Sequence, residues 1–241
     1  DIKKFSTEIN DLERKITLFH SNVVSCFTKN KDIKVDLIGF HGQTILHNPK
    51  NKYSKQLGDG NLLSQLSKRK VIYNFRQNDL LQGGEGAPLS PIFHQIIVKE
   101  NKIDLPVCIL NIGGISNLTL IKDLKEENLI SKDIGPGNCL IDEWIRRNKK
   151  GNYDRNGEFA NQGITNKLIL DQALDDFENI PARDINSFDI NDFEINFLRG
   201  LDLEDGASTI TDFTSKIISS NLIKIISRHN QNISRIIICG G

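Results

Sequence analysis

The chain has 241 residues, enough for one large domain or two small ones with a buried core. Its 31 basic residues balance its 31 acidic ones, so no overall field favours binding to nucleic acid or to an anionic membrane. No apolar run approaches the roughly 18 residues of a membrane-spanning helix, and the first residues have no signal-peptide pattern. We therefore expect a soluble, cytoplasmic protein without a nucleic-acid or membrane partner.

Methionine is absent from the chain, and the last residues are an apolar run that leads into Gly240 and Gly241. A strand that runs into a glycine turn rarely ends a natural domain, so we expect a fragment that is cut at both ends. The four cysteines are widely spaced, and Cys108 and Cys239 lie within apolar runs. Buried, reduced thiols are therefore expected rather than disulfides or a zinc site.

The first predicted site follows the first predicted strand. Apolar residues at helical spacing predict an amphipathic helix over residues 9–27, and residues 35–40 predict a strand that ends in the sequence HGQT. Polar side chains directly after a strand are typical of sites in α/β sheets. His41 could hold a substrate hydroxyl, and Gln43 or Thr44 could face the same cleft. The alternative is an ordinary hydrogen-bonded turn.

A second candidate site residue follows the next strand. Residues 48–60 are polar and predict a loop, residues 62–66 a short helix, and residues 70–75 a strand. Arg76 comes next, and its planar guanidinium suits recognition of a hydroxyl, carboxylate or phosphate group. The alternative is an exposed arginine at the end of a strand.

A glycine-rich sequence, GGEGAPL, begins at Gly83. A loop of this kind after a strand often contacts a ligand through its backbone, although its spacing is that of neither a P-loop nor a dinucleotide-binding fold. Residues 91–99 predict a helix, on which His94 is expected to be packed rather than catalytic. The charged residues 100–105 then predict a domain boundary.

The central stretch of the chain predicts a β-hairpin. An apolar strand over residues 107–112 leads into a Gly-Gly pair, and a second β-rich run covers residues 116–121. Small polar side chains surround the turn, at Asn111, Ser116 and Asn117. Together with glycines that let a backbone approach closely, they suit a wall that faces a phosphate group. A plain hairpin turn is the alternative.

A charged, loop-like segment separates this hairpin from the sequence DIGPGN, in which Asp133 precedes a Gly-Pro-Gly turn and a helix begins near Asn138. A carboxylate on a rigid turn beside a phosphate-binding hairpin is a candidate catalytic base. It could also be only a turn former or a helix cap.

The rest of the chain alternates helices and loops. Helices are predicted over residues 139–147, 164–177 and 207–226, and a strand over residues 236–239. The first of these helices carries the single tryptophan, Trp144, which we expect in the core. Residues 180–192 predict a polar loop that could reach the cleft.

Taken in order, these motifs resemble those of the 1,6-anhydro-N-acetylmuramic acid kinase family, sugar kinases of peptidoglycan recycling. They are HGQT at His41, LGDG at Leu57, FR-x-x-D at Phe75, GG-x-GAPL at Gly83, NIGGISNL at Asn111, D-x-GPGN at Asp133, the pair YD at Tyr153, SFD-x-NDF at Ser187 and STITDFT at Ser208. Each motif is short, but the resemblance extends over essentially the whole chain.

The resemblance implies an α/β protein with the actin-like ATPase (ribonuclease H-like) fold, in which two domains surround a cleft, here truncated at both termini. Residues 1–105 would be the remainder of the N-terminal domain on the substrate side. Residues 106–241 would be the second domain, with the phosphate-contacting hairpin. The implied ligands are ATP, Mg²⁺ and a small amino sugar, and a homodimer is considered as the assembly.

The resemblance also implies roles for individual residues. The catalytic carboxylate would be Asp133. The substrate-side contacts would be His41, Gln43, Arg76, Asp79, Gly84 and Asn138. The nucleotide contacts would be Asn111, Gly113, Gly114, Ser116 and Asn117. No residue is predicted to bind a metal ion directly.

Members of this family open the 1,6-anhydro bond with water and phosphorylate O6 with ATP. A carboxylate suits this chemistry because water is a poor nucleophile that must lose a proton as it attacks the anomeric carbon. The O6 that leaves can then attack the γ-phosphate, whose charge Mg²⁺ and backbone amides would stabilise. Another sugar kinase of the same superfamily and a catalytically silent binding relative are the alternatives.

Four positions depart from the family pattern. Ile134 replaces a threonine, Asn74 an acidic residue, Glu85 a glutamine and Ile190 an arginine. These departures bring local hydrogen bonds into question. The first phosphate loop and the adenosine segment of the family are also missing from the sequence, so we expect the 241-residue chain alone not to turn over ATP.

Overall fold

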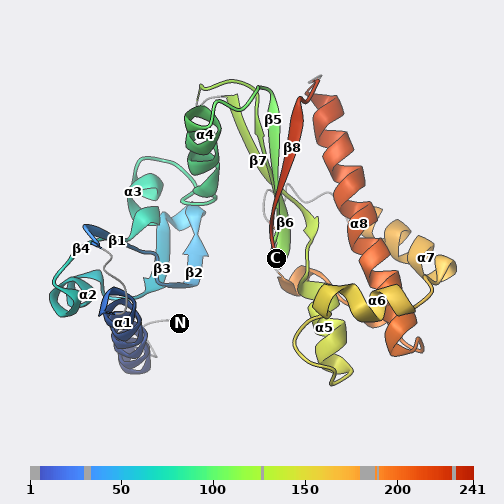
Figure 1. Cartoon of the computed structure of the whole chain (residues 1–241), viewed down its shortest axis with the longest axis horizontal. Coiled ribbons are helices and arrows are strands. Elements are labelled where there is room, and N and C mark those ends of the chain that lie inside the picture. The colour runs from blue at the N-terminus through green and yellow to red at the C-terminus, as the bar shows by residue number, and fades with distance from the viewer. Residues whose placement is uncertain (1–5, 30–33, 126–127, 180–187, 189, 230–231) are drawn as a thin grey trace. The chain divides into compact units, whose positions relative to one another are not determined.

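The computed structural model describes residues 6–29, 34–125, 128–179, 188, 190–229 and 232–241. The chain divides into two compact units, Asp1–Leu89 and Ser90–Gly241. Each unit combines helices with β-strands, as Figure 1 shows, so the predicted α/β class is confirmed. No helix within the described ranges is both long enough and apolar enough to cross a bilayer.

In its described residues, 6–29 and 34–89, the first unit contains two small sheets and three α-helices. β1 pairs with β4 in parallel, and β2 pairs with β3 in antiparallel fashion. The elements are α1 (Ser6–Lys29), β1 (Leu37–Phe40), β2 (Gln43–Asn48), the 3-10 helix η2 (Pro49–Asn51), β3 (Tyr53–Leu57), α2 (Gly60–Ser67), β4 (Lys70–Tyr73) and α3 (Phe75–Leu81).

Helix α1 supports the LGDG turn that joins β3 to α2. The carboxylate of Glu13 accepts a hydrogen bond from Gly58 N at 3.1 Å, and the hydroxyl of Thr17 accepts one from Asp59 N at 3.0 Å. Asp59 in turn caps α2, because its side chain accepts from Leu62 N at 2.9 Å. Polar contacts therefore join the turn to α1 before it and to α2 after it.

Two sequence predictions for this unit were wrong. Most of residues 48–60 is not a loop, since β3 pairs with β2 as a hairpin. The strand expected to reach residue 75 ends at Tyr73, and α3 begins at Phe75. Between them Asn74 adopts a left-handed conformation (φ 58°), which ends the strand and which asparagine tolerates. Arg76 therefore lies in the first turn of a helix and not at a strand end.

The second unit is built on a four-stranded sheet in the order β7-β6-β5-β8. Its strands are β5 (Val107–Ile112), β6 (Ile115–Ile121), β7 (Leu129–Pro136) and β8 (Arg235–Gly240), of which only β8 runs parallel to its neighbour β5. Its helices are α4 (Ser90–Glu100), α5 (Cys139–Arg147), η4 (Arg155–Gly157), α6 (Glu158–Gln162), α7 (Lys167–Glu178), η5 (Ile190–Asp192), η6 (Asn196–Leu198) and α8 (Leu203–Arg228). The predicted hairpin of β5 and β6 is confirmed.

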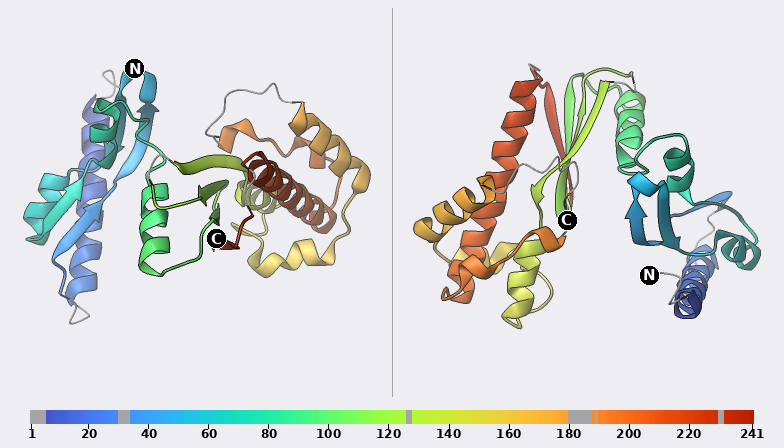
Figure 2. Two further views of the ribbon diagram at one scale, coloured as in Figure 1. Left: turned by 90° about the horizontal axis from the view of Figure 1, so that it is seen from above. Right: turned by 180° about the vertical axis from the view of Figure 1, so that it is seen from behind.

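The two faces of this sheet are covered by different helices (Figures 1 and 2). On one face Val98 of α4 packs against Val107, Ile109 and Ile121. On the other face the core residues of the strands pack against Ile218 of α8. The alternation of side chains along each strand therefore assigns every residue of the sheet to an α4 face or an α8 face.

A third cluster joins α5, α7 and α8 and contains Trp144, which is 8% exposed, as the sequence predicted. Its indole Nε1 donates to the carbonyl of Leu203 at 2.9 Å. All four cysteines are free thiols. Cys108 is buried as expected, whereas Cys239 is exposed because β8 pairs with β5 alone in the described sheet. Cys26 is exposed as well.

The segment before the Gly-Pro-Gly turn is also more regular than expected. Residues 129–136 form β7, so Asp133 lies within a strand rather than after a loop. The alternation that marks a strand is weak here, because Lys132 and Asp133 interrupt the apolar residues.

The charged residues 100–105 predict a domain boundary between residues 105 and 106. The compact units divide instead between Leu89 and Ser90, since α4 packs on the sheet of the second unit. His94 of α4 is half-buried, and its Nδ1 lies 2.9 Å from the hydroxyl of Thr119 on β6. The polar loop predicted over residues 180–192 lies largely outside the described residues, including 180–187 and 189.

Candidate active site

A row of polar side chains crosses the sheet of the second unit. In the register of the strands, Asp133 on β7 is opposite Asn117 on β6, Asn117 is opposite Asn111 on β5, and Asn111 is opposite Cys239 on β8. Residues that are directly opposite point to the same face of a sheet, here the α4 face. Asp133, Asn117 and Asn111 are each partly exposed. The topology thus gathers three of the predicted site residues that are up to 22 positions apart in the chain.

The tip of the β5–β6 hairpin is tied to the turn that follows β7. The carbonyl of Gly113 accepts a hydrogen bond from Asn138 N at 2.7 Å, and the carbonyl of Gly114 accepts one from Gly137 N at 2.9 Å. The side chain of Asn138 donates to the carbonyl of Ile112 at 3.3 Å. A Cβ on Gly137 would overlap the carbonyl of Gly113, so only glycine allows this approach. The structure therefore brings Asn138 and the glycine pair together, while their contacts with substrate and nucleotide stay predictions.

The two glycines of the hairpin tip themselves have space around them. A Cβ on Gly113 would come no closer than 3.6 Å to its neighbours, and one on Gly114 no closer than 3.8 Å, both ordinary contact distances. Neither residue has a positive φ. Packing within the chain therefore does not require glycine here, and the missing side chains leave the backbone open to a ligand such as a phosphate group.

Ser116 has a structural contact in this arrangement. It is fully buried, and its hydroxyl donates to the carbonyl of Pro136 at 3.1 Å. Its predicted contact with a nucleotide stays a prediction. The bond that the structure describes joins the start of β6, next to the hairpin tip, to the end of β7.

The carboxylate of Asp133 is half-buried and is oriented by the backbone. Its Oδ2 accepts a hydrogen bond from Phe188 N at 2.8 Å, across 55 positions of sequence. Sequence analysis missed this contact, because Phe188 belongs to a polar segment without a periodic pattern. A partly exposed carboxylate that a backbone N–H orients is a candidate proton acceptor.

The first unit holds a second cluster around Arg76. Its Nε and Nη2 both lie 3.2 Å from Nε2 of His41, and its Nη1 donates to the carbonyl of Gly86 at 3.5 Å. Partial burial lowers the pKa of Arg76, which nevertheless stays charged because its ordinary value is so high. The structure therefore brings together His41 and Arg76, while Gln43 is exposed on β2.

Asp79 organises the glycine-rich loop beside this cluster. Its Oδ2 accepts a hydrogen bond from Gly86 N at 2.7 Å, and its backbone carbonyl accepts one from Gly84 N at 2.8 Å. A Cβ on Gly84 would overlap the carboxylate of Asp79. These two residues, predicted as substrate contacts, are thus in contact with each other, and their roles toward a sugar stay predictions.

His47 is a member of this cluster that sequence analysis did not select. Its Nδ1 lies 3.1 Å from the hydroxyl of Ser54 on the neighbouring strand. Burial, and then the positive charge of Arg76, lower the pKa of His47, while a hydrogen bond to the backbone of Glu85 and the charge of Glu85 act in the opposite direction. The only signal in the sequence is a second histidine three residues after HGQT, on a segment whose pairing as β2 the sequence does not predict.

The described residues contain no group of three or more histidine, cysteine, aspartate or glutamate side chains that could hold a metal ion. Carboxylates nevertheless occur near the hairpin. Burial raises the pKa of Asp142, which lies in the first turn of α5, and the positive charge of Arg146 lowers it by a smaller amount.

Comparison with known proteins identifies the family. A model of the family described as anhydro-N-acetylmuramic acid kinase matches residues 3–241. Proteins named anhydro-N-acetylmuramic acid kinase are similar over nearly the whole chain. The relative from Pelagibacter ubique is 52% identical over 241 residues, which are 100% of this chain and 64% of the relative. The relative from Zymomonas mobilis is 38% identical over 240 residues, which are 97% of this chain and 62% of the relative. One from Rhodopseudomonas palustris is 36% identical over 217 residues, 87% of this chain and 57% of the relative.

The chain thus spans about three-fifths of the length of the curated relatives that it matches. Their family consists of sugar kinases of the actin-like ATPase type, as the order of motifs predicted. The match extends through both compact units and includes the polar row on the sheet and the cluster around Arg76. The chain belongs to the anhydro-N-acetylmuramic acid kinase family.

Proposed function

We propose that the protein that carries this chain is an ATP-dependent kinase that hydrolyses the 1,6-anhydro bond of 1,6-anhydro-N-acetylmuramic acid and phosphorylates O6. The product is N-acetylmuramic acid 6-phosphate. The family match and the names of the relatives support this proposal. The structural observation that carries it is the position of Asp133, half-buried in the same row as Asn117 and Asn111 beside an open glycine turn.

In this proposal Asp133 is the general base. It removes a proton from a water molecule as the water oxygen bonds to the anomeric carbon and the bond between that carbon and O6 breaks. The freed O6 then attacks the γ-phosphorus and displaces ADP. The hydrogen bond from Phe188 N to Oδ2 helps to orient the carboxylate.

ATP with Mg²⁺ would supply the phosphoryl group when bound. The residues that fit a phosphate group are the open backbone of Gly113 and Gly114 together with the amide side chains of Asn111 and Asn117 on the adjoining row. Backbone N–H groups and neutral amides can bind phosphate oxygens without adding a net charge. We assign the Mg²⁺ ion to the nucleotide rather than to a ligand set of this chain.

We assign the sugar contacts of the first unit to His41 and Arg76. Arg76 presents a planar set of donors, and His41 fixes one edge of that set through the contacts at 3.2 Å. Asp79 and Gly84 hold the glycine-rich loop whose carbonyl at Gly86 contacts the same guanidinium. A soluble cytoplasmic enzyme, active on a small sugar and ATP and able to form a homodimer, completes the proposal.

The catalytically silent alternative was suggested by departures from the family pattern, and the structure accounts for two of them. The side chain of Ile134 is 2% exposed and packs in the apolar core. Asn74 occupies a left-handed position that suits asparagine. Neither departure removes a polar group from the row that contains Asp133.

A substrate panel tests the proposal. The chain is joined to the flanking segments of the Pelagibacter ubique relative that lie outside the match, and turnover of ATP is measured with the anhydro sugar, with N-acetylmuramic acid and with glucose. We expect turnover with the anhydro sugar, and in ¹⁸O-labelled water we expect the label on the anomeric carbon and not in the phosphate. Turnover with an ordinary hexose alone would favour another sugar kinase, and sugar binding without turnover would favour the silent relative. The unjoined chain is expected to show no turnover.

A further inference from the structure

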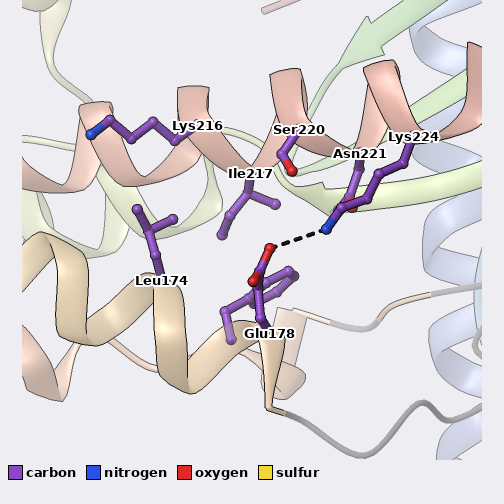
Figure 3. Close-up of a pocket in the computed structure, with 8 residues that line it drawn as sticks. Leu174, Glu178, Lys216, Ile217, Ser220, Asn221 and Lys224 are labelled. Carbon is purple, nitrogen blue, oxygen red and sulfur yellow. Dashed lines mark hydrogen bonds and ion pairs between the residues drawn. The ribbon is translucent and has the colours of Figure 1, made fainter. Parts of the chain in front are cut away.

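Helix α8 contacts the backbone of β7 directly beside Asp133. The side-chain Nδ2 of Asn221 donates a hydrogen bond to the carbonyl of Ile134 at 2.7 Å, and the two residues are 87 positions apart in the chain. Figure 3 shows Asn221 on α8 next to the strand. Ile134 is the residue that follows Asp133, so this bond acts on the Ile134–Gly135 peptide unit, one residue beyond the proposed base.

The hydrogen bond from Asn221 to Ile134 lies where the register between β6 and β7 shifts. Ser116 of β6 is opposite Gly135, but Asn117 is opposite Asp133, so Ile134 is the extra residue of a β-bulge. The extra residue of a bulge has no partner in the ladder of backbone hydrogen bonds. Asn221 therefore gives the Ile134 carbonyl a side-chain donor at the point where the register of the ladder shifts.

Two neighbours of Asn221 on the same side of α8 fix the bulge sterically. Gly135 has a φ of +148°, and a Cβ at this position would lie only 2.5 Å from Cγ2 of Ile217. Ile134 itself packs in the cluster that contains Ile218. Residues 217, 218 and 221 are spaced so that they share one face of a helix. The bulge is thus in contact with α8 through its backbone, its glycine and its apolar side chain.

We propose that Asn221 is a positioning residue for Asp133, which sets the direction of the carboxylate by holding the bulge at Ile134. The proposal rests on the assignment of Asp133 as the base. Asn221 does not touch the reacting atoms, since it lies on the α8 face of the sheet and Asp133 lies on the α4 face. Loss of the Asn221 side chain should change the orientation of the Asp133 carboxylate more than the affinity for the sugar.

The surroundings of Asn221 make a clean substitution series possible. Asn221 lines a pocket of about 320 Å³ between α7 and α8, together with Leu174, Ile217 and Ser220. An ion pair of 3.0 Å between Glu178 and Lys224 lies at this pocket (Figure 3). Asn221→Gln keeps an amide donor on a longer side chain, and Asn221→Leu, which has nearly the shape of asparagine, removes the donor.

A matched control is available on α5. The side chain of Asn148 donates to the carbonyl of Trp144 at 2.9 Å, which is also a partly buried bond from an asparagine to a backbone carbonyl. Asn148 lies at the end of α5 and makes no contact with β7 among its described hydrogen bonds. Asn148→Leu therefore removes the same kind of interaction away from Asp133.

The first measurement is amide hydrogen exchange of the chain itself, at Phe188, whose N–H is bonded to Asp133. Asn221→Leu should reduce the protection of this amide about ten-fold or more, whereas Asn148→Leu should leave it unchanged. The second is steady-state kinetics in the chain joined to the flanking segments of the Pelagibacter ubique relative. Asn221→Leu should lower kcat about ten- to hundred-fold with KM for the sugar within about two-fold, since a small misplacement of a catalytic group is costly. Asn221→Gln should restore most of kcat.

The outcomes separate this proposal from the proposed function. If Asn221→Leu and Asn148→Leu have the same effect on exchange and on kcat, Asn221 is only a structural residue. Unchanged kcat in Asn221→Leu together with loss of turnover in Asp133→Asn also contradicts the positioning role and leaves the base in place. Full turnover in Asp133→Asn contradicts the base assignment itself.

Discussion

Asp133 and Ile134 are neighbours in the sequence, but their side chains lie on opposite faces of the four-stranded sheet. Asp133 belongs to the polar row on the α4 face, whereas Ile134 packs in the core beneath α8. The residue that departs from the family pattern directly after the proposed base therefore lies in the core and not in the polar row.

The first prediction concerns this residue. Ile134→Thr should destabilise the chain by about 1–3 kcal/mol, because it places a hydroxyl in an apolar site. It should leave sugar affinity and the kcat of the completed enzyme nearly unchanged. Urea unfolding and steady-state kinetics provide the two measurements. Ile134→Val is the matched control, with an expected cost of about 0.5–1.5 kcal/mol. A large loss of kcat without a change in stability would show that Ile134 acts on the reaction.

The second prediction concerns the close approach of Gly84 to Asp79. Gly84→Ala should destabilise the chain by about 1–3 kcal/mol, because its Cβ would overlap the carboxylate that holds the glycine-rich loop. It should also weaken sugar binding in the completed enzyme, measured by titration calorimetry. Gly39→Ala is a suitable control, since its Cβ would meet only a ring atom of Phe75 at 3.8 Å. Equal effects of the two substitutions would argue against a specific role of the loop.

The third prediction concerns the guanidinium of Arg76. Arg76→Lys keeps the charge but loses the planar set of donors that contacts His41 and Gly86. We expect the KM for the sugar to rise about 10- to 100-fold, which corresponds to the loss of a charged hydrogen bond. The exposed Arg69 offers the matched substitution, Arg69→Lys, which should be neutral. An unchanged KM in Arg76→Lys would contradict the assignment of Arg76 as a sugar contact.

The fourth prediction is a pH dependence of stability caused by His47. Burial lowers its pKa in the folded chain, so the unfolded chain binds a proton more readily as the pH falls through the ordinary value of 6.5. The free energy of unfolding should therefore decrease as the pH is lowered from 7.5 through 6.5 toward the folded-state pKa. His94 contributes in the same direction, because burial lowers its pKa too. Urea unfolding at several pH values measures the slope.

His47→Gln identifies the share of this slope that comes from His47. The variant should lose part of the slope between pH 7.5 and 5.5, whatever its stability at neutral pH, and the part caused by His94 should remain. A slope that is the same in the parent chain and in His47→Gln would contradict the prediction.

Much of the fold could be predicted from the sequence where one pattern dominates. The apolar strands on either side of Gly113 and Gly114 form the expected hairpin, and the periodic residues before Phe27 form α1. The β2–β3 hairpin and β7 were missed, because polar residues such as Lys55 and Asp133 interrupt their alternation and only pairing with a neighbouring strand stabilises them.

In the candidate site too, local motifs could be predicted from the sequence, whereas contacts between separate segments could not. Asp133, Asn117 and Asn111 were selected on short motifs, and the register of the sheet explains why they share a face. The contributions of Phe188 and Asn221 could not be predicted, since each depends on a contact between distant segments, and that of His47 depends on the β2–β3 pairing. The hydrogen bond from Phe188 to Asp133 spans 55 positions, and the one from Asn221 to Ile134 spans 87.

The most direct test of the central claim is the turnover of Asp133→Asn. The chain is joined to the flanking segments of the Pelagibacter ubique relative, and kcat with the anhydro sugar and ATP is measured together with the affinity for the sugar. Asparagine has nearly the shape of aspartate but cannot accept the proton of water. We predict that kcat falls by about 10²- to 10⁴-fold while sugar affinity stays within about two-fold. A kcat equal to that of the parent enzyme would contradict the assignment of Asp133 as the base.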